Sequence, residues 1–227
     1  AYQAQREEKP DELYLQIPII QELLRSMHIP VFEAAGYEAD DVIGTIAANV
    51  RGVKRKTSTA NVIIVTGDKD LLQLVGDGVE VVLLRRGMTD TARYDTAGVI
   101  ERFGFPPERI PDYKALAGDP SDNYPGVPGI GEKTATELVK QFGGVDGVLR
   151  AAKAKTLPDG MRAKVAEKIR ANAETLTLGL RLATIVRDVP VAFRIADCVR
   201  AAYDRDAVIA QLRALGFASL VGRLPSH

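Results

Sequence analysis

The fold class of this chain is decided by residues 61–75, which read NVIIVTGDKDLLQLV. Residues 62–65 are four consecutive β-branched residues without polar alternation, which predicts a strand buried on both faces of a parallel sheet. Gly67 ends this strand, the leucines after it predict a short helix, and residues 79–84 (VEVVLL) predict a second strand. The order strand, helix, strand indicates an α/β layer with a mostly parallel sheet flanked by helices.

Helices are expected on both sides of this layer. Apolar residues at helical spacing predict helices over residues 11–27, with a kink or break near Pro18, and over residues 39–50. Five further helices are expected at 96–103, 111–117, 132–142, 162–170 and 207–215. We therefore predict an α/β part over residues 1–93 and a helical part over residues 94–227.

Composition limits the class of protein. The 227 residues include 30 Lys and Arg against 30 Asp and Glu, and a net charge of zero argues at first against a polyanionic partner. No apolar run approaches the ~20 residues that span a bilayer, so a cytoplasmic protein without a membrane partner is expected. Cys198 is the only cysteine, which excludes an internal disulfide and disfavours a zinc site. Any bound metal would therefore be held by oxygen.

Acidic residues gather in three places, each where a predicted element begins or ends. The candidates are Glu38, Asp40, Asp41, Asp68, Asp70, Asp119 and Asp122. Asp68 and Asp70 follow a parallel strand directly, at the end of a sheet where ligands bind. Taken singly, each cluster is better explained by helix caps and turns.

Taken together, the three clusters favour a metal site. Seven carboxylates with no cation among them except Lys69 would repel one another strongly. Hard cations such as Mg²⁺ prefer oxygen ligands, and two of them about 3.5–4 Å apart promote phosphodiester hydrolysis. If the clusters converge, they hold divalent ions, and Lys69 assists charge stabilisation. The rest of the chain then carries an excess of bases.

A glycine-rich turn between two predicted helices indicates DNA binding. Residues 126–142 read GVPGIGEKTATELVKQF, and small residues there let the backbone approach a phosphate at a helix N-terminus. This is the helix-hairpin-helix pattern, over residues 111–142, and its alternative is a helix turn with a packing glycine. Residues 126–187 carry eleven basic and six acidic residues, which favours binding without sequence preference. The candidate DNA-binding residues are Gly129, Gly131, Lys133 and Thr134.

Three segments of the chain resemble the 5′ nuclease family, specifically the 5′→3′ exonuclease domain of bacterial DNA polymerase I and stand-alone flap endonucleases. They are GYEADDVIGTIA (36–47), VTGDKDLLQL (65–74) and ALAGDPSDNYPGVPGIGEKTATELVKQFG (115–143). The resemblance implies a PIN-like core and a nuclease that cuts 5′ flaps and nicked or gapped duplexes in replication and repair. It also implies two or three Mg²⁺ or Mn²⁺ ions on the seven acids, and K⁺ on the carbonyls of residues 127–131.

The chain also departs from the family pattern. Relatives begin with a strand that bears a metal-ligating Asp, whereas this chain starts at Ala1, so an N-terminal part is expected to be missing. The family pattern Tyr-Lys-x-x-Arg places a lysine on the scissile phosphate; here Tyr2 and Arg6 match as catalytic candidates, but Gln3 replaces the lysine. We expect this fragment alone to be inactive. The alternatives are a non-catalytic helix-hairpin-helix DNA-binding protein and a PIN-type ribonuclease, and fusion to a DNA polymerase is left open.

Overall fold

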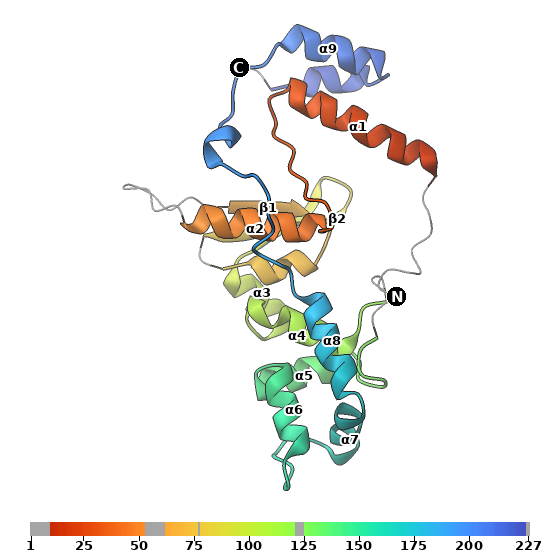
Figure 1. Ribbon diagram of the computed structural model, residues 1–227, viewed down its shortest axis with the longest axis vertical. Helices are drawn as coiled ribbons and strands as arrows, with labels where there is room; N and C mark the ends of the chain where they lie inside the picture. Colours follow the sequence, from red (N-terminus) through yellow and green to blue (C-terminus); the bar gives the residue numbers. More distant parts are fainter. Residues whose placement is uncertain (1–9, 53–61, 77, 121–124, 226–227) are drawn as a thin grey trace. The chain divides into compact units, whose positions relative to one another are not determined.

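The computed structural model describes residues 10–52, 62–76, 78–120 and 125–225 (Figure 1). The chain divides into two compact units. The first is built on Tyr37–Val189, and the second on residues 10–36 together with residues 190–225. The boundary expected near residue 93 lies inside the first unit, and the division into 1–93 and 94–227 stays a prediction.

The first unit contains a three-stranded sheet, with β1 (Val62–Thr66), β2 (Val79–Arg86) and β3 (Asp90–Tyr94) side by side in that order. β1 runs parallel to β2, and the 3-10 helix η1 (Asp70–Leu74) lies between them in sequence, as predicted. β3 pairs antiparallel with β2 and was not predicted. Its residues, DTARY, are mostly polar and largely exposed, so they carry no hydrophobic alternation.

The predicted burial of β1 on both faces is wrong for the described chain. Ile64 is 6% exposed, whereas Ile63 is 51% and Val65 is 60% exposed. Successive side chains of a strand point to opposite faces, so one face of β1 packs into the core and the other is open among the described residues. A run of β-branched residues carries no information about which of its faces is covered.

The helical predictions for the first unit are confirmed to within one or two residues. The confirmed helices are α2 (Ala39–Gly52), α3 (Thr96–Phe103), α4 (Ile110–Ala117), α5 (Glu132–Phe142) and α7 (Ala163–Ala171). Two helices were missed, α6 (Val145–Lys153) and α8 (Ala173–Ala183), and the 3-10 helix η2 (Pro107–Arg109) precedes α4. Their shared core includes Leu71, Leu116, Val139, Val148 and Ile169, each at most 1% exposed.

Gly118 and Gly126 lie in close contact at the two ends of the loop between α4 and α5, which we call the loop neck. The N–H of Val127 donates to the carbonyl of Leu116 at 2.9 Å, which brings Gly118 against Gly126. Gly118 has φ +79° and ψ 167°, a conformation that is essentially restricted to glycine. A Cβ atom there would lie 2.4 Å from the backbone N of Gly126. Only glycine fits this neck, and Asp119 follows it directly.

We expect Gly118→Ala to lower the free energy of unfolding by about 3 kcal/mol, because it combines backbone strain with a clash against backbone. Urea unfolding followed by circular dichroism measures this change. Gly76→Ala is the matched control, since its φ is not positive and nothing lies within 4 Å of its added Cβ. Equal stabilities for the two variants would contradict the close contact at the neck.

The buried carboxylate of Asp112 joins α4 to α6. Asp112 is 6% exposed and accepts a hydrogen bond from the N–H of Val145 at 2.7 Å, while Arg109 lies 3.5 Å away. Burial raises the pKa of this carboxyl above its ordinary value of 3.8, and the Val145 N–H and the Arg109 charge oppose that shift. Asp112 therefore favours the folded state most when it is protonated.

This shift predicts a pH dependence of stability. Below the ordinary pKa the contribution of Asp112 is fully present, and it is lost as the pH rises through the raised pKa of the folded state. Asp112→Asn keeps an oxygen acceptor for Val145 but cannot ionise. The stability of this variant relative to the wild type should therefore rise from about pH 4 upward and then level off. Urea titrations between pH 4 and pH 8 measure it, and a difference that does not vary with pH would refute the shift.

The second unit contains α1 (Asp11–Ser26), α9 (Arg205–Ala214) and the 3-10 helices η3 (Ile195–Cys198) and η4 (Ala218–Arg223). α1 continues unbroken through Pro18, so a break there is not observed. The two α-helices meet where Nε2 of Gln211 donates to Oγ of Ser26 at 3.1 Å. Across the described residues, no helix has both the length and the apolarity to cross a membrane.

Candidate functional site

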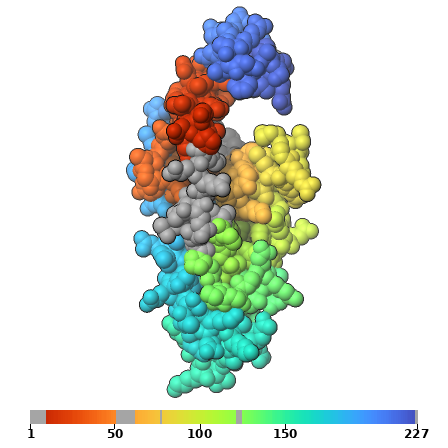
Figure 2. All heavy atoms as spheres, turned by 90° about the vertical axis from the view of Figure 1, so that its right-hand side faces the viewer, coloured from red at the N-terminus to blue at the C-terminus, as the bar shows by residue number. Residues whose placement is uncertain are grey.

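A cleft of about 1110 Å³ opens on the first unit where β1, α4 and α5 end or begin. Its walls include Asp68 and Asp70 after β1, Asp119 after α4, and Lys133 at the start of α5. On one face of this unit, the atoms of the β2–β3 region (yellow) lie next to those of α4 and α5 (green) in Figure 2. The cleft therefore brings two of the acidic clusters together with the glycine-rich turn.

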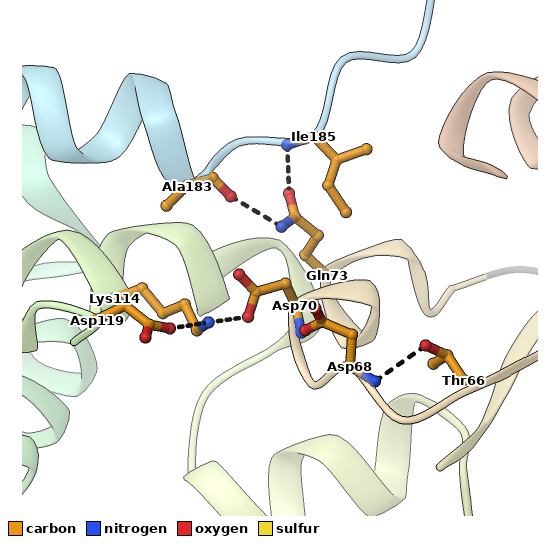
Figure 3. A network of polar contacts seen from close by, with 8 residues as sticks. All are labelled: Thr66, Asp68, Asp70, Gln73, Lys114, Asp119, Ala183 and Ile185. Atoms are coloured by element: carbon orange, nitrogen blue, oxygen red, sulfur yellow. Dashed lines mark hydrogen bonds and ion pairs between the residues drawn. The ribbon is translucent and has the colours of Figure 1, made fainter. Parts of the chain in front are cut away.

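The centre of the cleft is a lysine between two carboxylates. Nζ of Lys114, on α4, lies 2.6 Å from Oδ2 of Asp119 and also contacts Oδ1 of Asp70 (Figure 3). The side chains of Asp70 and Asp119 are each 13% exposed and that of Lys114 is 16% exposed. The expectation that Lys69 is the only cation among the acids is thus wrong. Lys69 lines the same cleft with an exposed side chain.

Turn chemistry places Asp70. Oγ1 of Thr66 accepts a hydrogen bond from the N–H of Asp68 at 2.9 Å, and Oδ1 of Asp68 accepts one from the N–H of Asp70 at 2.8 Å (Figure 3). These bonds satisfy the backbone after β1 and turn the side chain of Asp70 inward. The turn hydrogen bonding that the sequence analysis considered for Asp68 and Asp70 is therefore present. It directs the carboxylate of Asp70 into the cleft.

The first acidic cluster has a different position. Oδ2 of Asp41 accepts a hydrogen bond from the N–H of Glu38 at 3.3 Å, and Oδ1 accepts one from the N–H of Val186 at 2.9 Å. Glu38, Asp40 and Asp41 are absent from the walls of the cleft. The structure therefore does not bring this cluster to Asp70 and Asp119. Asp122, Tyr2 and Arg6 lie outside the described residues.

Three polar side chains hold the segment after α8 to the sheet layer. Gln73, which is 3% exposed, donates to the carbonyl of Ala183 at 2.9 Å and accepts from the N–H of Ile185 at 3.0 Å (Figure 3). Asp41 accepts from Val186, and Oγ1 of Thr45 accepts from the N–H of Val189 at 3.0 Å. In this structure Asp41 therefore binds the backbone of the segment that follows α8.

Asp70 and Asp119 suit a divalent cation. Two mostly buried carboxylates from separate elements share one positive charge, and apart from Lys114 no described group satisfies Oδ1 of Asp70. Carboxylate oxygens are the ligands that Mg²⁺ and Mn²⁺ prefer. Among the residues that the structure describes, no three His, Cys, Asp or Glu side chains are grouped as a complete metal site. The suitability of the cleft for a divalent cation therefore rests on Asp70 and Asp119, with Asp68 nearby in sequence.

The glycine-rich turn combines a left-handed glycine with a helix start that has no side-chain cap. Gly129 has φ +75°, and Gly131 precedes α5, which begins without a side-chain cap. An uncapped helix start leaves N–H groups for an anion. Nζ of Lys168 lies 3.2 Å from the carbonyl of Gly129, which shows that this carbonyl attracts a cation. Lys133 is exposed and Thr134 is half-buried on the first turn of α5.

Lys114 is the site residue that sequence reasoning missed. It lies inside a helix whose other residues are largely apolar, DYKALA, five positions before Asp119. Nothing in that spacing points to Asp70, which is 44 residues earlier in the chain. Only the packing of α4 against η1 brings the ammonium between the two carboxylates.

Comparison with known proteins assigns both halves of the chain. Residues 1–104 match a family model described as 5′-3′ exonuclease, N-terminal resolvase-like domain, and residues 105–206 match 5′-3′ exonuclease, C-terminal SAM fold. DNA polymerase I of Bacillus caldotenax is 40% identical over 225 residues, which cover 99% of this chain and 24% of that protein. DNA polymerase I of Chloroflexus aurantiacus is 42% identical over 233 residues, which cover 99% of this chain and 23% of that protein. The chain spans about a quarter of the length of these relatives.

Solved structures share the fold. The T5 D15 protein co-crystallised with metal ions has a TM-score of 0.63 at 22% identity, with 98% of this chain and 76% of that chain covered. The catalytic core of Rad2 in complex with a DNA substrate has a TM-score of 0.59 at 15% identity, with 97% and 73% covered. These likenesses concern the fold, whereas the two family models together match residues 1–206 in sequence. The chain belongs to the 5′-3′ exonuclease family.

Proposed function

We propose that this chain is the nuclease part of a structure-specific 5′ nuclease that hydrolyses DNA phosphodiesters in bacterial replication and repair, joined to or acting with a DNA polymerase. The observation that carries the proposal is the cleft in which Asp70, Asp119 and Lys114 meet beside the glycine-rich turn. Family membership supports it. Polymerase I relatives and solved relatives with metal ions and DNA are consistent with it.

The chain's own residues divide the work of binding. Gly129, Gly131, Lys133 and Thr134 present backbone N–H groups and positive charge to a duplex backbone, which grips DNA without reading its sequence. Asp70 and Asp119, with Asp68 beside them, would hold a divalent cation, which supplies charge neutralisation and Lewis acidity at a phosphate when bound. Lys69 lies at the same cleft and adds positive charge there.

The remaining assignments of the sequence are also proposed. Asp122 would join Asp70 and Asp119, and Tyr2 and Arg6 would contact the substrate. Glu38, Asp40 and Asp41, which lie outside the walls of the cleft, would hold a second or third Mg²⁺ or Mn²⁺ ion apart from that pair. The carbonyl of Gly129, which here attracts the ammonium of Lys168, would hold K⁺. The protein would act on chromosomal DNA in the bacterial cytoplasm.

Cleavage of a 5′-labelled flap duplex tests the function, with this chain and with the full-length product of its gene. We expect the full-length protein to cut near the flap junction with Mg²⁺ and to bind without cutting in EDTA. Blunt duplex of the same sequence is the control substrate. Binding by the full-length protein without cutting would favour a non-catalytic DNA-binding protein, and cutting of RNA alone would favour a PIN-type ribonuclease.

A further inference from the structure

A second hollow of about 880 Å³ lies against β2, β3 and α3, outside the acidic centre. Among the residues that the structure describes, four cationic side chains line this hollow, against one acidic residue, Glu101. The four are Lys69, Arg85, Arg93 and Arg102. The hollow therefore carries a strong excess of positive charge in a chain whose net charge is zero.

Tyr94, at the end of β3, contacts one of these arginines, Arg102. Its ring is buried at 6% exposure, and its hydroxyl accepts a hydrogen bond from Nη1 of Arg102. The Arg102 guanidinium lies 5.4 Å from the Tyr94 ring centroid and 5.3 Å from that of Phe103. Burial alone would raise the pKa of the Tyr94 hydroxyl, but hydrogen bonding and positive charge from Arg85 and Arg102 outweigh it and lower the pKa. Arg102 is thus held against the ring and the hydroxyl of Tyr94, and Arg85 lines the same hollow.

The charges of Arg85 and Arg102 are not neutralised by carboxylates. Arg93 pairs with Glu80, whereas neither Arg85 nor Arg102 makes an ion pair with any residue that the structure describes. Both side chains belong to exposed residues. Planar guanidinium groups match the oxygens of phosphate in a bidentate fashion and stack well on aromatic rings. Arg102, which lies over a buried ring, and Arg85 in the same hollow are together suited to an oxyanion.

The hollow lies next to the acidic cleft. Gly67, Lys69, Glu101 and Arg102 line both of them. A polyanion that passes Asp70 and Asp119 would therefore meet Lys69 and Arg102 next and then Arg85. A flexible strand with regularly spaced phosphates can occupy both places at once, which a single small anion cannot do.

We propose that Arg85 and Arg102 bind a backbone phosphate of a DNA strand that continues beyond the acidic cleft. The inference rests on the proposed nuclease function and adds a second phosphate-binding site to it. Tyr94 is a positioning residue, because it orients the guanidinium group of Arg102. The site holds the strand without reading its bases, since it contacts phosphate only.

Fluorescence anisotropy with a labelled 5′-flap duplex in EDTA tests this site. It measures Kd and its salt dependence between 50 and 200 mM salt. We expect Arg85→Gln and Arg102→Gln each to raise Kd by about five- to tenfold and each to reduce the salt slope by about one. Arg93→Gln is the matched control, because Glu80 already neutralises that residue, and its Kd should change less than about twofold.

Tyr94→Phe separates positioning from charge. It removes the hydroxyl and keeps the ring, so Kd should rise by about two- to threefold while the salt slope stays that of the wild type. Thermal unfolding of each variant identifies any loss of folding. If thermal unfolding shows that Arg102→Gln is destabilised, the Kd of Arg85→Gln decides whether the site binds DNA, because Arg85 is an exposed residue of β2.

Two outcomes would overturn the inference. One is that Arg85→Gln and Arg102→Gln bind the flap as Arg93→Gln does. The other is that inorganic phosphate, at constant ionic strength, removes the difference between the variants and the wild type, because the site would then hold free phosphate. Failure of the proposed function looks different: the full-length wild type would bind the flap in Mg²⁺ without ever cutting it, whatever the arginine variants do.

Discussion

Replacing Asp119 by Asn should reduce the rate of 5′-flap cleavage by about a thousandfold in the full-length protein. Asn keeps the size of the side chain but removes the negative charge that would hold a divalent cation, and charge stabilisation of this kind contributes about 4 kcal/mol to a transition state. Binding of the flap in EDTA should stay within about twofold of the wild type, because loss of a carboxylate removes no contact to phosphate.

The measurement is single-turnover cleavage of a labelled flap with Mg²⁺, with flap binding measured separately. Asp159→Asn is the control: it removes one carboxylate from an exposed residue outside the cleft, and its rate should match the wild type. Equal rates for Asp119→Asn and the wild type would remove Asp119 from the proposed metal site. A parallel loss of cleavage and binding would show instead that the loop neck at Gly118 had been disturbed.

The second large effect is expected at Lys114. Lys114→Met leaves the carboxylates of Asp70 and Asp119 facing each other without a cation, each side chain 13% exposed. Removing one partner of a mostly buried charge pair costs about 3 kcal/mol. The metal-free variant should therefore unfold at a lower urea concentration than the wild type, and Mn²⁺ should restore more stability to the variant than to the wild type.

Lys140→Met is the matched control for this prediction. Lys140 lines the same cleft on an exposed position of α5 and makes no ion pair among the described residues. Its replacement should change the free energy of unfolding by less than about 0.5 kcal/mol. If Mn²⁺ stabilises Lys114→Met no more than it stabilises the wild type, the two carboxylates do not form a cation site.

Local patterns in the sequence were sufficient for most of the first unit. The parallel pair β1 and β2 and the helices α2, α3, α4, α5 and α7 follow from hydrophobic periodicity and from glycines at helix ends. Such signals depend only on residues that are close together in the sequence, so they can be interpreted without knowledge of the fold. β3 and the open face of β1 were not predictable in this way, because the side chains of β3 are mostly polar and the burial of a strand depends on what packs against it.

The candidate site shows the same division. Sequence spacing identified the acidic clusters, and turn hydrogen bonds at Asp68 explain how one of them is built. Sequence spacing did not distinguish the role of Asp41 from that of Asp70. Asp41 accepts a hydrogen bond from the backbone of Val186, whereas Asp70 lines the cleft. A carboxylate at an element boundary has the same sequence signature in both roles, since its partners are distant in the chain.

By itself, the sequence determined that this chain has an α/β layer, a glycine-rich turn before a basic helical segment, and three clusters of acidic residues with a single cysteine. These properties depend on residue type and local spacing. Only the tertiary structure decided which charges meet: Lys114 lies between Asp70 and Asp119, and Arg102, held by Tyr94, shares one hollow with Arg85. Electrostatic energy depends on distance and burial in space, and a folded chain sets both through contacts between residues far apart in sequence.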